Sequence, residues 1–333
     1  MAKRARSEET GEDRLIARYF RPIARHPAAF DLIDDAATLA PPPGHELVLK
    51  VDAIVGQVHF FEDDPADAVA RKALRVNLSD LAAKGAKPVG FLLTLALPAG
   101  VTSKWLAAFS RGLASDARRY GCPVLGGDTV RTPGPAMISV TAFGTVPKGA
   151  MVHRFGARTG DHVFVTGTIG DAVLGLKLRT GEGKRWALGA SERKHLASRY
   201  LVPQPRNGIA KSVLAYATAS MDVSDGLAGD LAKLCRASKV GAQIDVARVP
   251  LSKAARSVLA RNGRLIEAML SGGDDYEVLC TVPPRKAAAF QAAARMAGVP
   301  VTAIGRIVKG EGAHFLRADG KRLSFKRASF SHF

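Results

Sequence analysis

Short apolar runs and amphipathic helices alternate along this chain, and that alternation limits its fold more than any other feature. The first half is predicted to contain, in order, a helix at 12–25, strands at 35–40 and 46–58, a helix at 65–84, a strand at 89–97, a helix at 102–120 and a strand at 136–146. Elements in this order predict a mixed α/β domain that ends near residue 148.

The second half continues the alternation. Its predicted strands are 161–166, 242–246, 276–282 and 301–308, and its predicted helices are 170–179, 191–200, 207–217, 226–237 and 284–297. A chain of 333 residues is long enough for two domains of ordinary size, each with its own core. We therefore expect two α/β domains with mixed sheets, at 1–148 and 149–333.

Three cysteines and the apolar segments indicate the cellular setting. Cys122, Cys235 and Cys280 stand far apart without a CxxC pair, which is typical of reduced, buried thiols and not of a zinc site. No apolar run reaches 18 residues, and the charged N-terminus lacks the apolar core of a signal peptide. We expect a cytoplasmic protein without a membrane span.

The chain is strongly basic. It carries 48 Lys and Arg against 30 Asp and Glu, a formal net charge of +18. The basic residues are scattered in short pairs and aromatic residues make up only 6%, so no stacking surface for nucleic acid is indicated. This pattern favours solvated basic faces that attract anionic nucleotides over a nucleic-acid interface.

Carboxylates are nevertheless gathered into short clusters framed by glycine and serine. They are Asp34-Asp35, Asp52, Asp80, Gly126-Gly127-Asp128-Thr129, Asp222-Val223-Ser224-Asp225-Gly226 and Gly272-Gly273-Asp274-Asp275-Tyr276-Glu277. Adjacent carboxylates repel, and Mg²⁺, which takes hard oxygen ligands beside phosphate oxygens, is one reason to hold them together. The clusters therefore point to metal-assisted phosphate chemistry.

Each cluster alone is also compatible with an ordinary structural role. Turn pairs, helix caps and solvated faces all use aspartate, and His59 has the alternative of a satisfied core histidine. Gly126-Gly127-Asp128 is the more telling case, because glycines let the backbone approach a phosphate. The chain has neither a G-x₄-G-K-[ST] nor a G-x-G-x-x-G sequence, which disfavours a P-loop kinase and a Rossmann dehydrogenase.

Taken in order, these motifs resemble the thiamine-monophosphate kinase family, whose superfamily also holds aminoimidazole ribonucleotide synthetase and selenophosphate synthetase. The stretches that carry the resemblance are 58–60, 72–86, 126–129, 165–171 and 271–277. The resemblance implies a two-domain aminoimidazole ribonucleotide synthetase-like architecture and a homodimer paired through its N-terminal domains. It also implies direct phosphoryl transfer from ATP to thiamine monophosphate, giving thiamine diphosphate.

The resemblance also implies roles for individual residues. Several Mg²⁺ ions would be held by Asp35, Asp52, Asp80, Asp128 and Asp222, with Asp225 beside them. ATP would contact Gly127, Asp128, Arg154 and Ser224, and thiamine phosphate would contact His59, Asp274 and Phe325. No side chain is expected to act as a nucleophile, because phosphoryl transfer depends on positioning and charge neutralisation.

The chain departs from the family pattern at several positions. Lys50 and Val51 stand where the family carries hydroxyl side chains before the aspartate at 52, Ile33 replaces a glycine, and Asp274 replaces a glutamate. One hypothesis is that Lys50 places an ammonium where a metal ion would sit. The departures leave two alternatives open: a homologue that binds nucleotide and thiamine phosphate with weakened catalysis, and a sister enzyme with another acceptor.

Overall fold

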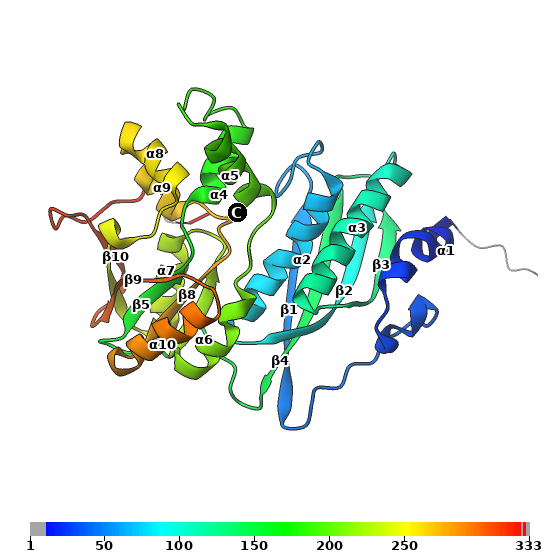
Figure 1. Ribbon diagram of the computed structural model, residues 1–333, viewed down its shortest axis with the longest axis horizontal. Helices are drawn as coiled ribbons and strands as arrows, with labels where there is room; N and C mark the ends of the chain where they lie inside the picture. Colours follow the sequence, from blue (N-terminus) through cyan, green and yellow to red (C-terminus); the bar gives the residue numbers. More distant parts are fainter. Residues whose placement is uncertain (1–10, 328, 331–333) are drawn as a thin grey trace, which may run out of the picture. The chain divides into compact units, whose positions relative to one another are not determined.

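The computed structural model describes residues 11–327, 329 and 330, and it contains two sheets with helices packed on them (Figure 1). The strands are β1 His45–Val55, β2 Lys87–Leu97, β3 Val124–Arg131, β4 Met137–Pro147, β5 His162–Thr166, β6 Ala219–Val223, β7 Gly241–Asp245, β8 Glu277–Val282, β9 Val301–Val308 and β10 Gly312–Leu316. The α-helices are α1 Gly11–Leu15, α2 Ala66–Ala83, α3 Ser103–Tyr120, α4 Asp171–Arg179, α5 Ala190–Leu201, α6 Ala210–Tyr216, α7 Leu227–Ser238, α8 Lys253–Arg261, α9 Leu265–Ser271 and α10 Pro284–Met296. A π-helical turn lies at Ile16–Phe20, and 3₁₀ turns lie at Arg21–Ile23, Pro27–Leu32, Asn207–Ile209 and Val246–Arg248.

The chain forms two compact units that interleave in sequence. Unit 1 comprises the described part of 1–42 with Leu49–Leu74 and Pro88–Phe143, and unit 2 comprises Pro43–Val48, Arg75–Lys87 and the described residues from Gly144 onward. The domain ranges 1–148 and 149–333 drawn from the sequence stay a prediction.

Unit 1 is built around the sheet of order β1-β4-β2-β3, in which β2 and β3 run parallel. Helix α3 begins at its cap Thr102, whose hydroxyl accepts the Trp105 N–H at 3.1 Å, and ends at the left-handed Gly121. Helices α2 and α3 pack closely, since a Cβ on Gly112 would lie 2.5 Å from the Asp67 carbonyl oxygen. Both helices lie over the sheet in Figure 1.

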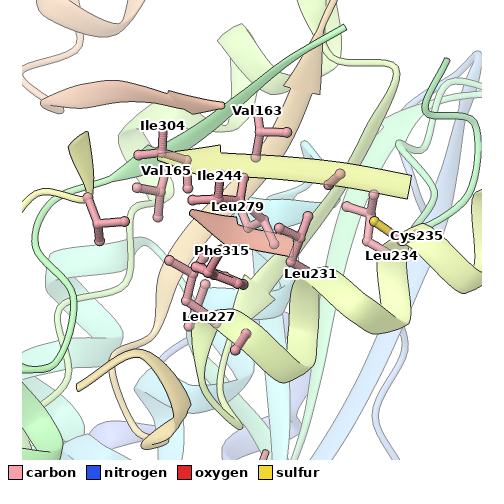
Figure 2. Packing of buried hydrophobic residues seen from close by; sticks show 14 of the residues in the cluster. Val163, Val165, Leu227, Leu231, Leu234, Cys235, Ile244, Leu279, Ile304 and Phe315 are labelled. Carbon is pink, nitrogen blue, oxygen red and sulfur yellow. The ribbon is translucent and has the colours of Figure 1, made fainter. Parts of the chain in front are cut away.

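Unit 2 is built around the sheet of order β10-β7-β9-β5-β8-β6. Successive residues of β5 alternate between its faces: Val163 and Val165 pack in one hydrophobic cluster and Phe164 packs in another. Figure 2 shows the first cluster, in which α7 contributes Leu227, Leu231 and Leu234 at helical spacing. The second cluster lies against α6, α10 and the end of α2.

A smaller helical cluster joins α4, α5, α8 and α9 in unit 2. Its buried centre comprises Leu174, Leu196, Val258 and Met269, together with Ala254 and Ala255. Helices α8 and α9 were not predicted from the sequence, because their short apolar pattern lies between segments with stronger patterns. No helix in the described part of the chain combines the length and apolarity needed to cross a bilayer.

Several predicted elements need correction. The strand expected at 35–40 is absent; Asp34 instead accepts the Ala36 N–H at 3.3 Å in a local turn. The helix expected at 12–25 breaks into α1, the π-helical turn and a 3₁₀ turn that contains Pro22. Strands β3, β6 and β10 were missed, since glycines or short length hide their alternation.

Candidate functional site

Two acidic segments of unit 2 lie against each other through their backbones. The Asp222–Gly226 segment joins β6 to α7, and the Gly272–Glu277 segment leads into β8. The Asp274 N–H donates to the Ser224 carbonyl at 2.8 Å, and a Cβ on Gly273 would lie 2.5 Å from the same oxygen. The glycine is thus required by the approach of the two segments to each other.

The same contact continues through residues with unusual backbone angles. Asp274 and Tyr276 have φ values of 72° and 50°, in the left-handed region that side chains other than glycine rarely adopt. The Tyr276 N–H donates to the Val223 carbonyl at 2.8 Å, and the Tyr276 carbonyl accepts the Ser79 hydroxyl of α2 at 3.4 Å. These bonds bring the helix turn that carries Asp80 against the two acidic segments. Backbone strain of the kind seen at Asp274 and Tyr276 typically persists at functional sites.

Asp230 and Lys233 of α7 fix the turn before their helix. One Asp230 carboxylate oxygen accepts the N–H groups of Ser224 and Asp225 at 3.0 and 2.9 Å. The other carboxylate oxygen accepts a hydrogen bond from the Lys233 ammonium at 2.8 Å, and that ammonium also contacts the Asp225 carboxylate. Neither residue was predicted from the sequence, although their spacing of three on a helix places them on one face.

Burial and hydrogen bonds shift the pKa values of Asp230 and Lys233. Burial raises the pKa of Asp230 against the opposing hydrogen bond from Lys233. Burial lowers the pKa of Lys233, but its hydrogen bonds to Asp225 and Asp230 outweigh burial and leave that pKa raised. Asp225, assigned to magnesium by the resemblance, is therefore already neutralised by an ammonium.

Glu277 is a buried structural carboxylate. It has no exposed surface and accepts a hydrogen bond from Arg199 at 2.8 Å, two from Arg206 at 2.6 Å each and one from the Thr166 hydroxyl at 2.7 Å. A Cβ on Gly167 would lie 2.1 Å from its Oε1 atom. Its acceptor sites are thus occupied by the protein.

Asp275 is likewise directed into the fold. Its carboxylate accepts the N–H groups of Gly170 and Ala172, at 2.7 and 3.3 Å, where α4 begins. Burial raises the pKa of Asp275 well above its usual range. Of the Gly272–Glu277 cluster, Asp274 is half-buried, and it is the position that the resemblance assigns to thiamine phosphate.

Asp80 and Asp222, both in unit 2, come from regular elements. Asp222 lies on β6 opposite Val278 of β8 and is 4% exposed. Asp80 lies half-buried in the last turns of α2. Burying a carboxylate as deeply as that of Asp222 costs free energy unless it is paired or holds a cation. Its hard oxygen atoms are the kind of ligand that a magnesium site requires.

Unit 1 contributes three of the predicted carboxylates. Asp35 is exposed beyond the Asp34 turn, and Asp128 is exposed on β3 opposite Thr94. Asp52 lies on β1, where its Oδ1 atom is 3.0 Å from the Lys50 ammonium. Asp52, like Asp225, is thus paired with a lysine.

Gly127 has a structural explanation that the sequence analysis did not foresee. The Gly126-Gly127-Asp128-Thr129 motif lies inside β3 rather than in a phosphate-binding loop. A Cβ on Gly127 would lie 1.9 Å from the Leu93 carbonyl of β2, beside a register shift between Phe91 and Leu92. The approach of two strands therefore requires this glycine.

The remaining predicted ligands lie in different surroundings. In unit 1, His59 accepts the Val55 N–H at its Nδ1 atom, 3.0 Å away, which leaves the proton of a neutral ring on Nε2. In unit 2, Arg154 is exposed in the loop whose His153 carbonyl accepts the Ser220 N–H of β6 at 2.8 Å.

Two aromatic residues near the C-terminus have different surroundings. Phe325 is partly buried and packs edge-on against Phe315, with ring centroids 5.3 Å apart. Phe330 is 51% exposed, and its N–H donates to the Asp225 carbonyl at 3.0 Å. Phe330, which the sequence analysis passed over, thus lies directly on the acidic turn.

The oxygen donors fit magnesium at some positions and not at others. Asp80, Asp222 and the Ser224 hydroxyl offer hard oxygen ligands, as Mg²⁺ prefers. Asp52 and Asp225 do not fit, because each contacts a lysine ammonium. Within residues 11–327, 329 and 330, no group of three or more His, Cys, Asp or Glu side chains that could hold a metal ion is assembled.

Comparison with known proteins identifies close relatives. The N-terminal and C-terminal domain models of AIR synthase related proteins match residues 33–146 and 158–316. A thiamine-monophosphate kinase of Caulobacter vibrioides is 45% identical over 301 residues, which are 89% of this chain and 84% of that protein.

Solved structures agree with these matches. The crystal structure of a thiamine-monophosphate kinase from Stenotrophomonas maltophilia has a TM-score of 0.82 at 36% identity, covering 93% of this chain and 96% of that one. AaThiL, complexed with AMPPCP and TMP, has a TM-score of 0.76 at 33% identity, covering 88% and 89%.

Proposed function

The chain belongs to the thiamine-monophosphate kinase family, and we propose from this that it transfers the γ-phosphoryl group of ATP to thiamine monophosphate. The bond between the γ-phosphorus and the β–γ bridging oxygen breaks, and a new bond forms to a phosphate oxygen of thiamine monophosphate. The products are ADP and thiamine diphosphate. Membership also confirms the resemblance and the two-domain α/β architecture expected from the sequence motifs.

One observation carries the proposal: the segments predicted to contact the two substrates are joined by their backbones. Ser224 is assigned to ATP and Asp274 to thiamine phosphate, and the Asp274 N–H donates to the Ser224 carbonyl at 2.8 Å. Direct transfer requires donor and acceptor phosphates to lie close together and in line. The complex of AaThiL with AMPPCP and TMP supports the same substrate pair.

The proposed roles of individual residues follow the sequence assignments. Gly127, Asp128, Arg154 and Ser224 contact ATP, and His59 and Asp274 contact thiamine monophosphate. The aromatic contact predicted from the sequence is Phe325, and Phe330, whose N–H donates to the Asp225 carbonyl, is the alternative. Arg154 is exposed and offers a planar cation to phosphate oxygens. His59 is held in place by the Val55 N–H, which donates to its Nδ1 atom.

Magnesium is part of the proposal. Asp35, Asp80, Asp128 and Asp222 are its proposed ligands, and the bound ions would neutralise charge on the phosphate oxygens. The buried Asp222 and the helical Asp80 support this choice by their oxygen chemistry. Asp52 and Asp225 are left out of the ligand set because of their lysine partners.

We also propose a cytoplasmic homodimer. Leu49 and Val51 on β1 are 64% and 57% exposed, and apolar side chains exposed together on a strand support contact with a second copy. The three buried, unpaired cysteines support a reducing compartment. Light scattering of the wild-type protein and of Leu49→Glu tests the dimer: the variant should have the mass of a single chain.

The test of the activity is phosphorus NMR of the purified protein with ATP, Mg²⁺ and thiamine monophosphate. Thiamine diphosphate signals should appear with the wild-type protein and disappear in Asp222→Asn. Asp319→Asn, which changes an exposed aspartate paired with Lys321, is the matched control and should retain full activity. Binding of both substrates without any product would instead favour the weakened homologue, and a wild-type protein that binds neither would refute the proposal.

A further inference from the structure

Lys50 and Asp52 interrupt the inward side of an apolar strand. Side chains of β1 alternate, so that Val48 and Ile54 are buried at 6% and 2% while Leu49 and Val51 face outward. Lys50 and Asp52 share the side of Val48 and Ile54. Their side chains retain 30% and 39% of their exposure, so solvent and ions reach them.

An ion pair in this position does little for the stability of the fold. Ion pairs that keep this much exposure contribute little, because water screens the charges and two long side chains are immobilised. Apolar residues on the inward side of β1 would pack at least as well. The position of the pair therefore points to a role for its charge.

The Lys50 ammonium lies where a cation bound to the Asp52 Oδ1 atom would sit. It lies 3.0 Å from the Asp52 Oδ1 atom. A magnesium ion on the same Oδ1 atom would lie about 2.1 Å from it, so the two cations would be held within about 5 Å of each other. Neither neighbour of Asp52 supplies a further ligand side chain, since Val51 and Ala53 are apolar.

We propose that Lys50 is a positioning residue whose ammonium replaces one divalent cation at Asp52, so that this chain neutralises Asp52 without a metal. The inference rests on the proposed function, because it concerns one of the cation positions beside the phosphates. The ammonium provides a single positive charge and three donors, which suits a phosphate oxygen as well as the carboxylate. It is present at any magnesium concentration.

The experiment counts metal ions directly. Manganese, as a paramagnetic substitute for magnesium, is titrated into the full chain with saturating AMPPCP, and electron paramagnetic resonance measures the free ion. Lys50→Met should bind one more Mn²⁺ per chain than the wild-type protein. Lys50→Met combined with Asp52→Asn should return to the wild-type number, because the new ligand is gone.

Three further variants make the count decisive. Asp52→Asn alone should leave the wild-type number unchanged, and Lys50→Arg should do the same because it keeps the charge. Lys321→Met, which removes the lysine from another pair spaced by two residues, should also change nothing. Circular dichroism verifies that each variant is folded.

Two results would overturn the inference: loss of one Mn²⁺ in Asp52→Asn alone, or no gain in Lys50→Met. Neither depends on turnover. A protein that makes no thiamine diphosphate but gains one Mn²⁺ in Lys50→Met would refute the proposed function and retain the role of Lys50. An active kinase whose Asp52→Asn variant loses one Mn²⁺ would support the proposed function and refute the role of Lys50.

Discussion

The Arg206 guanidinium donates two hydrogen bonds to the buried Glu277 carboxylate, each 2.6 Å long. Arg199 donates a third at 2.8 Å, so two cations converge on one carboxylate that has no exposed surface. Glu277 belongs by sequence to an acidic cluster that suggests metal binding. In the structure it joins β8 to the segments that carry the two arginines.

We predict that Glu277→Gln destabilises the protein by about 3–5 kcal/mol, because it leaves the buried Arg199 and the partly buried Arg206 without their counter-charge. Urea unfolding measures the change. Glu182→Gln is the matched control, since Glu182 pairs with Lys177 at an exposed position, and it should change the free energy of unfolding by about 1 kcal/mol or less. Equal effects of the two substitutions would contradict the structural role of Glu277.

Asp230→Ala should disturb the acidic turn without changing any proposed ligand. The substitution removes the acceptor of the Ser224 and Asp225 N–H groups and should cost about 1–3 kcal/mol of stability. The misplaced turn should also lower kcat/KM for ATP by about 10- to 100-fold. Asp245→Ala removes the exposed acceptor of a single N–H group, that of Ala247, away from this turn. It should lower stability and leave kcat/KM unchanged.

Substitutions of Phe330 and Phe325 distinguish a role in substrate contact from a role in packing. Phe325→Ala removes the edge-on contact with Phe315 and should lower the free energy of unfolding by about 1–3 kcal/mol. Phe330→Ala should leave stability within about 0.5 kcal/mol, because the residue is exposed. It should raise the KM for thiamine monophosphate, because the Phe330 backbone is bonded to the Asp225 turn. Steady-state kinetics measure the KM of both variants, and thermal melts measure their stability. A larger KM effect from Phe325→Ala would support the sequence assignment instead.

The three thiols should be inert in the folded protein and should make its stability fall at high pH. Burial raises the pKa of Cys122 and Cys280 to about 12 and that of Cys235 to about 11, from 9.0. Above pH 9 the unfolded chain loses thiol protons that the folded chain keeps, so stability declines from pH 9 towards 11 and 12.

Two measurements test the thiols. Reaction with a disulfide reagent at pH 8 should release no thiol signal until the protein is unfolded. Unfolding in urea at pH 8 and pH 10 should show a smaller decline for Cys235→Ala than for the wild-type protein, by about 1 kcal/mol. Rapid labelling of the folded protein, or identical declines, would contradict the burial of these groups.

The sequence determined the family, the α/β alternation and the bounds of the longer elements. Helices α2, α3 and α10 and strands β1, β2, β5 and β9 lie within a few residues of their predicted ranges, because each has a strong local period and clear end signals. Strand β3 was not predicted, since its glycines are unfavourable locally and are required only by the approach of Leu93.

The partners of the carboxylates were decided by the tertiary structure alone. Asp225, Asp275 and Glu277 look alike in sequence, yet one contacts Lys233, one holds the start of α4 and one binds two arginines. The identity of a residue fixes its charge and its donor atoms. Which charge meets which depends on strands and helices far apart in the chain, because a carboxylate is neutralised by whatever cation the fold brings within hydrogen-bond distance.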